Sequence, residues 1–164
     1  MSLRVEFERL TAEIIGGFPA AAQEEHLQLD FKLVNDPNLG GQGDRKILAK
    51  CISGFANSSG GIVVWGVDAR RNDEGIDCAG EIQPINSLGI FLSRLNELSG
   101  RATSPAVEGV VHKKFETSSN RGFAATLGRV DKQDFQISGS LIQGSFAGGY
   151  NDPGFDERQR MGLS

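Results

Sequence analysis

Residues 52–68 decide the fold, and they read Ile-Ser-Gly-Phe-Ala-Asn-Ser-Ser-Gly-Gly-Ile-Val-Val-Trp-Gly-Val-Asp. The Asn, Ser and Gly residues at 57–61 are typical of a helix end followed by a tight turn. Residues 62–67 form a continuous apolar run, the pattern of a strand that is buried on both faces. Asp68 comes directly after this run. The stretch therefore predicts a helix that turns into the central strand of a sheet.

The chain before this stretch predicts two helices and one strand. Residues 45–56 carry a helical apolar stripe, with Asp44 as the expected N-cap. Residues 3–15 carry a second stripe, which ends at a pair of glycines. Residues 27–33 alternate apolar and polar side chains, which predicts a strand with one polar face. That polar face carries His26, Gln28, Asp30 and Lys32.

The chain after it predicts a loop, a helix and a hairpin. The charged and glycine-containing residues 69–84 are expected to be a loop, and residues 85–99 a helix. Residues 107–115 and 123–130 are expected to be two strands joined by a turn. The expected fold is α+β, a small mixed sheet with the helices near 45–56 and 85–99 packed on one face.

Length and charge limit the possible functions. The 164 residues suit a single domain, expected over residues 1–135, and residues 136–164 are rich in Gly and Ser and expected to be loosely ordered. The formal net charge of −4 argues against a protein that coats nucleic acid non-specifically, although it allows a local basic patch. No apolar run reaches the roughly 18 residues of a membrane span, and no signal-peptide core is visible, so we expect a cytoplasmic protein.

The two cysteines, Cys51 and Cys78, do not form a CxxC pair. The histidines, His26 and His112, lie far from both in the sequence, which argues against a structural zinc site. Cys51 falls on the apolar stripe of its helix and reads as a buried thiol. A Cys51–Cys78 disulfide remains an open alternative.

Three acidic residues are candidate metal ligands. Glu25 precedes the strand at 27–33, Asp30 lies on its polar face, and Asp68 ends the apolar run. If the two strands are neighbours, these carboxylates can converge in one cleft and hold Mg²⁺ or Mn²⁺, which prefer oxygen ligands. Lys32, on the same face as Asp30, could then contact a phosphate. The alternative is that all of these are solvated side chains at strand ends.

Two of these segments resemble the motifs of the Schlafen AlbA-type domain family. Residues 25–32, Glu-His-Leu-Gln-Leu-Asp-Phe-Lys, are similar to the opening motif, in which Glu is followed at a short distance by Glu-Phe-Lys. Residues 52–68 are similar to the second motif, in which Ala-Phe-Ala-Asn-Thr-x-Gly-Gly leads into an apolar strand ending in Gly-Val-Asp. The resemblance covers about residues 3–130 and implies a domain that handles nucleic acid.

The resemblance also implies site residues. Some Schlafen proteins cut transfer or ribosomal RNA with a metal-dependent acidic triad, which here corresponds to Glu25, Asp30 and Asp68 with Mg²⁺ or Mn²⁺. Asp30 stands where the family motif has Glu, so its carboxylate is withdrawn by one methylene. Schlafen cores resemble two such lobes clasped around RNA, and a homodimer of this chain would rebuild that arrangement.

Basic residues suggest where nucleic acid would bind. The expected phosphate contacts are Lys32, Lys50, Arg70, Arg71, Lys113 and Lys114. Three functions follow as alternatives: a metal-dependent endoribonuclease, a non-catalytic DNA- or RNA-binding regulatory module, or a nucleotide-binding protein. The third is poorly supported because the sequence contains no GxxxxGK[ST] phosphate loop.

Overall fold

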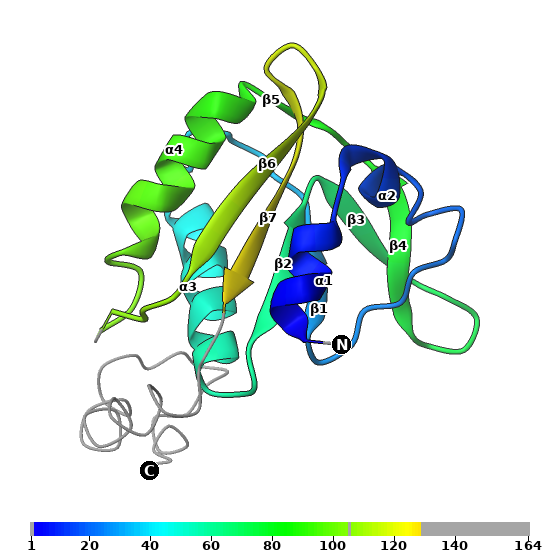
Figure 1. The fold of residues 1–164 in the computed structure, drawn as a ribbon, viewed down its shortest axis with the longest axis horizontal. Helices are drawn as coiled ribbons and strands as arrows, with labels where there is room; N and C mark the ends of the chain where they lie inside the picture. Colours follow the sequence, from blue (N-terminus) through cyan, green and yellow to red (C-terminus); the bar gives the residue numbers. More distant parts are fainter. Residues whose placement is uncertain (1, 105, 129–164) are drawn as a thin grey trace.

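The strand β2 (Gly61–Trp65) lies inside a five-stranded mixed sheet, and every one of its residues is buried. The structure, a computed structural model, describes residues 2–104 and 106–128 (Figure 1), so the segment 136–164 lies outside the described residues. The elements in chain order are α1 (Leu3–Arg9), α2 (Ala12–Gly16), β1 (Leu29–Lys32), α3 (Gln42–Ala56), β2, β3 (Val67–Arg71), β4 (Asp77–Ile82), β5 (Ile85–Asn86), α4 (Leu88–Ser99), β6 (Val111–Ser118) and β7 (Arg121–Gly128).

The neighbours of β2 run in opposite directions. β1 pairs with it in parallel from Leu29↔Ile62 to Lys32↔Trp65, and β7 pairs with it antiparallel on the other side. β5 continues along the same side of β7 as β2, and β6 forms a hairpin with β7 on its far side. This confirms the predicted α+β class and the central position of the apolar strand.

The alternating side chains of β2 divide the interior into two cores. Val63 and Trp65 pack with α3 and α4, whose buried side chains include Leu48, Ile52, Leu88, Phe91 and Leu95. Ile62 and Val64 pack on the other face with Phe7 of α1 and Ile15 of α2. The two long helices therefore share one face, as predicted, and Figure 1 shows the two short N-terminal helices on the opposite face. The sequence had not indicated this second layer.

The single helix predicted over residues 3–15 is wrong, because the segment forms two helices. Leu10 adopts an extended conformation with φ −62° and ψ 140° at the end of α1. Thr11 then caps α2, since its hydroxyl accepts a hydrogen bond from the backbone N–H of Ile14 at 3.1 Å. The threonine at this position is the sequence signal for the break.

Two other helix starts differ from their predictions. α3 begins at Gln42 with Gly41 as its N-cap, and Asp44 lies in the first turn, where its charge still complements the helix dipole. The helix predicted at 85–99 begins at Leu88, because Ile85 and Asn86 pair with β7 as the short strand β5.

The apolar run 62–67 does not form one strand. Gly66 has φ +105°, a backbone conformation that favours glycine, and it separates β2 from β3. The loop predicted at 69–84 is also wrong: β3 and β4 form an antiparallel hairpin, a second sheet of two strands. The hairpin predicted near 107–130 is confirmed, with its strands at Val111–Ser118 and Arg121–Gly128.

A chain of hydrogen bonds links the sheet to α4. The indole N–H of Trp65 donates to the hydroxyl of Thr126 at 2.9 Å, and that oxygen lies 2.8 Å from Nδ1 of His112. Nε2 of His112 lies 2.6 Å from Ser99 Oγ, whose hydroxyl donates to the carbonyl of Leu95. Because a carbonyl only accepts, Ser99 must accept from Nε2–H, which leaves Nδ1 to accept from Thr126. Burial lowers the pKa of His112 to about 4, consistent with this neutral ring.

The close approach of β6 to Gly122 of β7 allows the packing of this hairpin to be tested. A Cβ at Gly122 would lie 2.0 Å from the carbonyl oxygen of Phe115, a backbone atom that cannot rotate away. We expect Gly122→Ala to lower the free energy of unfolding by about 1–3 kcal/mol. Gly54→Ala is the control, because a Cβ there meets nothing within 4 Å and alanine favours α3 by about 0.5–1 kcal/mol. Urea denaturation of both variants measures the difference, and equal stabilities would contradict this packing.

Candidate functional site

The outer edge of β1 brings two of the predicted acidic residues together. The backbone groups of Gln28 and Lys32 point toward β2, where their carbonyls accept from Ile62 and Gly66. The N–H of Phe31 therefore points away from the sheet, and Glu25 Oε1 accepts its hydrogen bond at 2.8 Å. Glu25 thus satisfies a donor that an edge strand would otherwise leave open.

Asp30 and Lys32 lie on the sheet face that is covered by α3. Their partners across the β1–β2 ladder are Val63 and Trp65, both of which belong to the α3–α4 core. The Lys32 ammonium lies 3.0 Å from Asp30 Oδ2, so the two side chains form a partly buried ion pair. Burial lowers the pKa of Lys32, but its hydrogen bond and attraction to Asp30 prevail and raise that pKa above its usual value.

The carboxyl groups of Glu25 and Asp30 form a hydrogen bond that requires one of them to be protonated. Burial, assisted by the side-chain hydrogen bond to Asp30, raises the pKa of Glu25 to about 7. The Phe31 N–H and the charge of Lys32 act against this rise. A carboxylic acid with such a pKa is protonated in about half of the molecules near neutral pH, and it then donates to its neighbour.

Cys51 is a member of this cluster that the sequence did not indicate. It lies on α3, and burial raises the pKa of its thiol to about 12, with the negative charge of Asp30 adding to the rise. Cys51 and Cys78 are both free thiols. The open alternative of a disulfide between them is therefore not the arrangement found, and Cys51 is a half-buried side chain packed against the α3–α4 core rather than a fully buried one.

Asp68 belongs to β3 of the second sheet, and its carboxylate is paired with Arg70. Its Oδ2 accepts from Arg70 Nε at 2.8 Å, and Arg70 also contacts Glu81 of β4 at 2.9 Å. The prediction that Asp68 ends the central strand is wrong, because the chain leaves that strand at Gly66. Across residues 2–104 and 106–128, no three His, Cys, Asp or Glu side chains form a group that could hold a metal ion.

The predicted basic residues lie in different places, and several contact carboxylates. Arg71 contacts Asp77 at 3.3 Å, and Lys114 contacts Glu116 at 3.5 Å. Lys113 lies over the ring of Phe115, on the sheet face opposite Lys114, because neighbouring residues of β6 alternate. Lys50 is exposed on α3 beside Cys51. The six residues therefore do not form one continuous patch.

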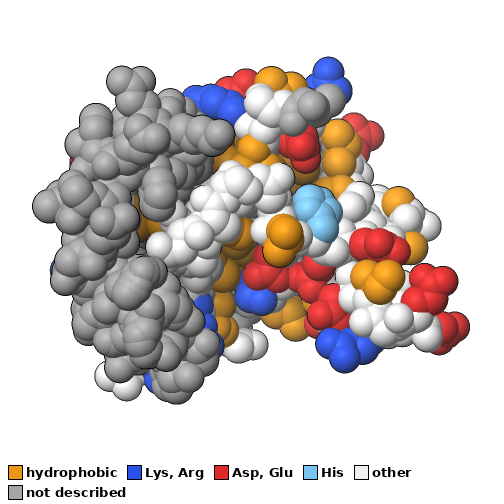
Figure 2. Space-filling view, turned by 90° about the horizontal axis from the view of Figure 1, so that it is seen from below, with side chains coloured by type: hydrophobic (Ala, Val, Ile, Leu, Met, Phe, Trp, Pro, Cys, Tyr) orange, Lys and Arg blue, Asp and Glu red, His pale blue; other side chains and the backbone are white. Residues whose placement is uncertain are grey.

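The β3–β4 hairpin is more acidic than basic. Arg70 and Arg71 share it with Asp68, Asp73, Glu74, Asp77 and Glu81. Figure 2 shows red carboxylate side chains gathered on the right of the molecule, where the hairpin lies, with few blue side chains among them. The alternation of apolar and polar residues from Val67 to Arg70 and the Asn-Asp-Glu-Gly turn ending at Gly75 were the available signals for this hairpin.

The arrangement defines a small α+β domain with a partly buried carboxylate pair at a sheet edge. The Schlafen, AlbA_2 family model matches residues 25–114, more than half of the chain, and the protein belongs to this family. The family suggests nucleic-acid binding. No curated protein matches the chain. None of the helices in the described part of the chain is both long and apolar enough to cross a membrane.

The raised pKa of Glu25 predicts how stability depends on pH. A carboxyl whose pKa rises from 4.5 to about 7 on folding stabilises the fold fully below 4.5, and this contribution is lost as the pH rises through 7. We expect Glu25→Gln to remove this loss, changing the slope by at most about 1.4 kcal/mol per pH unit. His112, whose pKa is lowered to about 4, contributes with the opposite sign in acid and is unchanged in the variant.

Urea denaturation at a series of pH values measures this slope. Exposed Glu24, which precedes Glu25 in the chain, supplies the control variant Glu24→Gln. If the curves for wild-type and Glu25→Gln protein stay parallel from pH 4.5 to above 7, Glu25 is not the titrating group.

Proposed function

We propose that this domain binds nucleic acid along the outer edge of β1 and the adjoining β3–β4 hairpin. Membership of the Schlafen, AlbA_2 family carries the proposal, and the matched residues 25–114 contain all six predicted phosphate contacts. Lys32 at the edge strand and Arg70 and Arg71 on the hairpin are the cations of this surface. The proposed partner is RNA or DNA.

The ion pairs of the hairpin are suited to exchange with phosphates. The side chains of Arg70 and Arg71 are 59% and 70% exposed, and exposed ion pairs contribute only about 0–1 kcal/mol. A phosphate can therefore replace a carboxylate as the partner of either guanidinium at small cost. The nearby carboxylates repel the backbone, so binding should be weak and strongly dependent on salt.

Removing the two hairpin arginines tests the binding surface. We expect Arg70→Ala with Arg71→Ala to weaken binding of an RNA or DNA oligonucleotide and to reduce the slope of log K against log salt by about 0.7–0.9 per lost contact. The matched control removes Arg4 and Arg101, which form exposed ion pairs with Glu8 and Glu97. Fluorescence anisotropy over a salt series measures both, and equal losses in the two double variants would refute this surface.

A second candidate function is metal-dependent cleavage of RNA. The favouring observation is the Glu25–Asp30 contact, since Mg²⁺ is often bound by one or two carboxylates together with substrate phosphates. The three-carboxylate cage implied by the resemblance does not fit the arrangement as it stands, because Asp68 is paired with Arg70. Glu25 and Asp30 would hold the ion, which would supply a Lewis acid and an activated water. Asp68 could join them only after leaving Arg70.

Two substitutions that each break an ion pair of Arg70 test the role of Asp68. If the domain is a nuclease that uses the triad, Asp68→Asn should abolish cleavage of transfer RNA with Mg²⁺ or Mn²⁺, because an amide is a poorer ligand for a hard cation. Glu81→Gln removes the other carboxylate partner of Arg70 and should retain activity. Equal losses would mean that Asp68 acts through Arg70. Binding without cleavage in the wild type would instead identify a non-catalytic regulatory module.

The homodimer stays a prediction. In the described part of the chain, β6 is the outer strand on the side of the sheet away from β1, and it could pair with a second copy. The Phe115 ring, which lies on this strand, is covered by Lys113 and contributes to the core of its own chain. A dimer contact on this strand would therefore use the backbone edge of β6 rather than the Phe115 side chain.

A further inference from the structure

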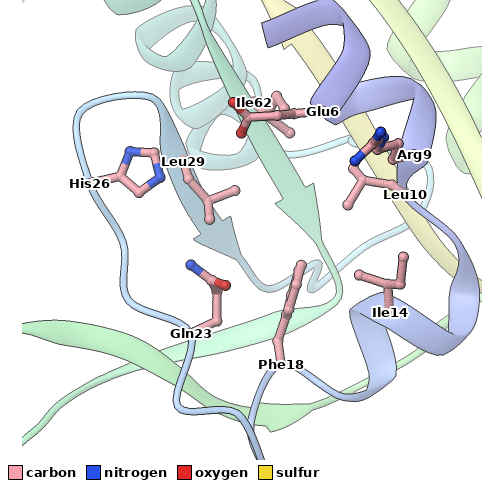
Figure 3. Close-up of a pocket in the computed structure, with 9 residues that line it drawn as sticks. All are labelled: Glu6, Arg9, Leu10, Ile14, Phe18, Gln23, His26, Leu29 and Ile62. Carbon is pink, nitrogen blue, oxygen red and sulfur yellow. The ribbon is translucent and has the colours of Figure 1, made fainter. Parts of the chain in front are cut away.

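A cavity of about 230 Å³ lies between the N-terminal helices and the beginnings of β1 and β2. It is on the sheet face that carries α1 and α2, opposite the face of Asp30 and Lys32. Figure 3 shows that its walls come from α1, α2, the segment that leads into β1, and both strands. None of the predicted site residues lines it.

The floor of the cavity is apolar and includes an aromatic ring. Phe18 projects into it between Gln23 and Ile14 (Figure 3), and its ring is held against Phe31 with a centroid distance of 5.6 Å. Ile14 forms part of the wall and is 45% exposed, a large fraction for an isoleucine. A flat apolar ring placed here would cover both side chains and remove apolar surface from water.

The rim carries one cation and several hydrogen-bonding groups. Within the described residues, the Arg9 guanidinium has no hydrogen bond or ion pair, and His26 lies at the opposite end of the cavity. Nδ1 of His26 accepts from the Gln28 N–H at 3.2 Å, so its Nε2 carries the proton. Gln23 donates through its amide nitrogen to the Glu24 carbonyl, which leaves its side-chain oxygen as an acceptor. The Glu6 carboxylate is a second acceptor.

Size and chemistry together select the ligand. The volume of about 230 Å³ is below the roughly 300–1,000 Å³ typical of sites for drug-sized molecules, so the cavity accommodates one ring system and not a whole ligand or a peptide segment. The ring needs hydrogen-bond donors on its edge for Gln23 and Glu6, and an attached anion for Arg9. A nucleobase with an exocyclic amino group, joined to its own phosphate, has all of these features.

We propose that this cavity binds the base of one unpaired nucleotide, with the base against Phe18 and Ile14 and its phosphate at Arg9. This proposal rests on the proposed nucleic-acid binding and specifies where one nucleotide of the bound nucleic acid is held. A base can enter only when it is unstacked from its neighbours, so single-stranded or looped nucleic acid is the substrate class. The two acceptors select adenine, cytosine or guanine over uracil or thymine.

The position of the cavity connects it with the carboxylate pair. Leu29 and His26 line the cavity, and Glu25 and Asp30 are their immediate neighbours in the chain. Phe31, whose N–H is bound by Glu25, packs its ring on Phe18 at the cavity floor. A base in the cavity therefore directs the next part of its strand across the outer edge of β1, toward Glu25 and Lys32.

Binding of oligonucleotides to variants of the wall tests the proposal. Ile14→Glu places a charge in the wall at an already exposed position, and we expect it to weaken binding of single-stranded adenine or cytosine oligomers by about tenfold. Ile90→Glu is the matched control, because Ile90 of α4 is 47% exposed and lies far from the cavity. Arg9→Gln should also weaken binding, compared with Arg101→Gln as the control.

The oligomers are labelled and used as RNA and as DNA, and a fully paired duplex of the same length is the comparison. The proposal predicts that Ile14→Glu affects single strands more than the duplex, and that adenine and cytosine oligomers bind more tightly than uracil or thymine oligomers. If wild-type protein binds single strands but Ile14→Glu and Ile90→Glu bind equally well, the cavity proposal is overturned while the proposed function stands. If wild-type protein binds no nucleic acid, both fail.

Discussion

The burial of β2 on both faces is the constraint on which the rest of the structure depends. Val63 and Trp65 pack in the core under α3 and α4, and Ile62 and Val64 pack in the core under α1 and α2. A shift of either pair of helices would therefore disturb the packing of the other pair. The turn that delivers α3 to β2 is equally constrained. A Cβ on Gly61 would lie 2.2 Å from the Phe55 ring, and one on its ladder partner Gly128 would lie 2.9 Å from Phe55 Cβ. Phe55 therefore covers a pair of glycines, which explains physically why that motif contains a phenylalanine and ends in glycine.

Glu25, at the outer edge of β1, has a structural role as well as its proposed role in metal binding. Glu25 binds the outward N–H of Phe31 and also contacts Asp30, so its carboxyl supports the edge strand whether or not it takes part in a reaction. A loss of function on substituting Glu25 would then have two explanations, local unfolding of β1 or loss of a catalytic group. For Asp68 the alternative explanation is its ion pair with the exposed Arg70, which the comparison with Glu81→Gln separates from a direct role.

More of the fold than of the candidate site could be predicted from the sequence. Apolar runs and stripes report burial directly, and they located β2, α3, α4 and the β6–β7 hairpin. The same apolar run concealed the break at Gly66, because Trp65 and Val67, on either side of this left-handed glycine, are both buried. Asp68 was consequently placed on the wrong sheet. Strand alternation would have shown that Lys113 and Lys114 face opposite ways.

The cavity could not have been predicted in this way. It depends on residues brought together by tertiary packing, such as Leu10 of the α1–α2 junction and Ile62 of β2, which both line it. No residue spacing in the sequence indicates that these distant residues lie close together. The contribution of residues 3–16 to the second core was also hidden, because their stripe fits one amphipathic helix as well as two short ones.

The hydrogen-bond chain through Trp65 has a spectroscopic consequence. The sequence contains a single tryptophan, and its indole is buried, bonded to Thr126 and in edge contact with Phe91 of α4. All indole emission from the protein thus originates at the junction of the sheet and the last described helix. A change in that emission reports whether α4 remains docked on β2 and β7, and it does so without any added label.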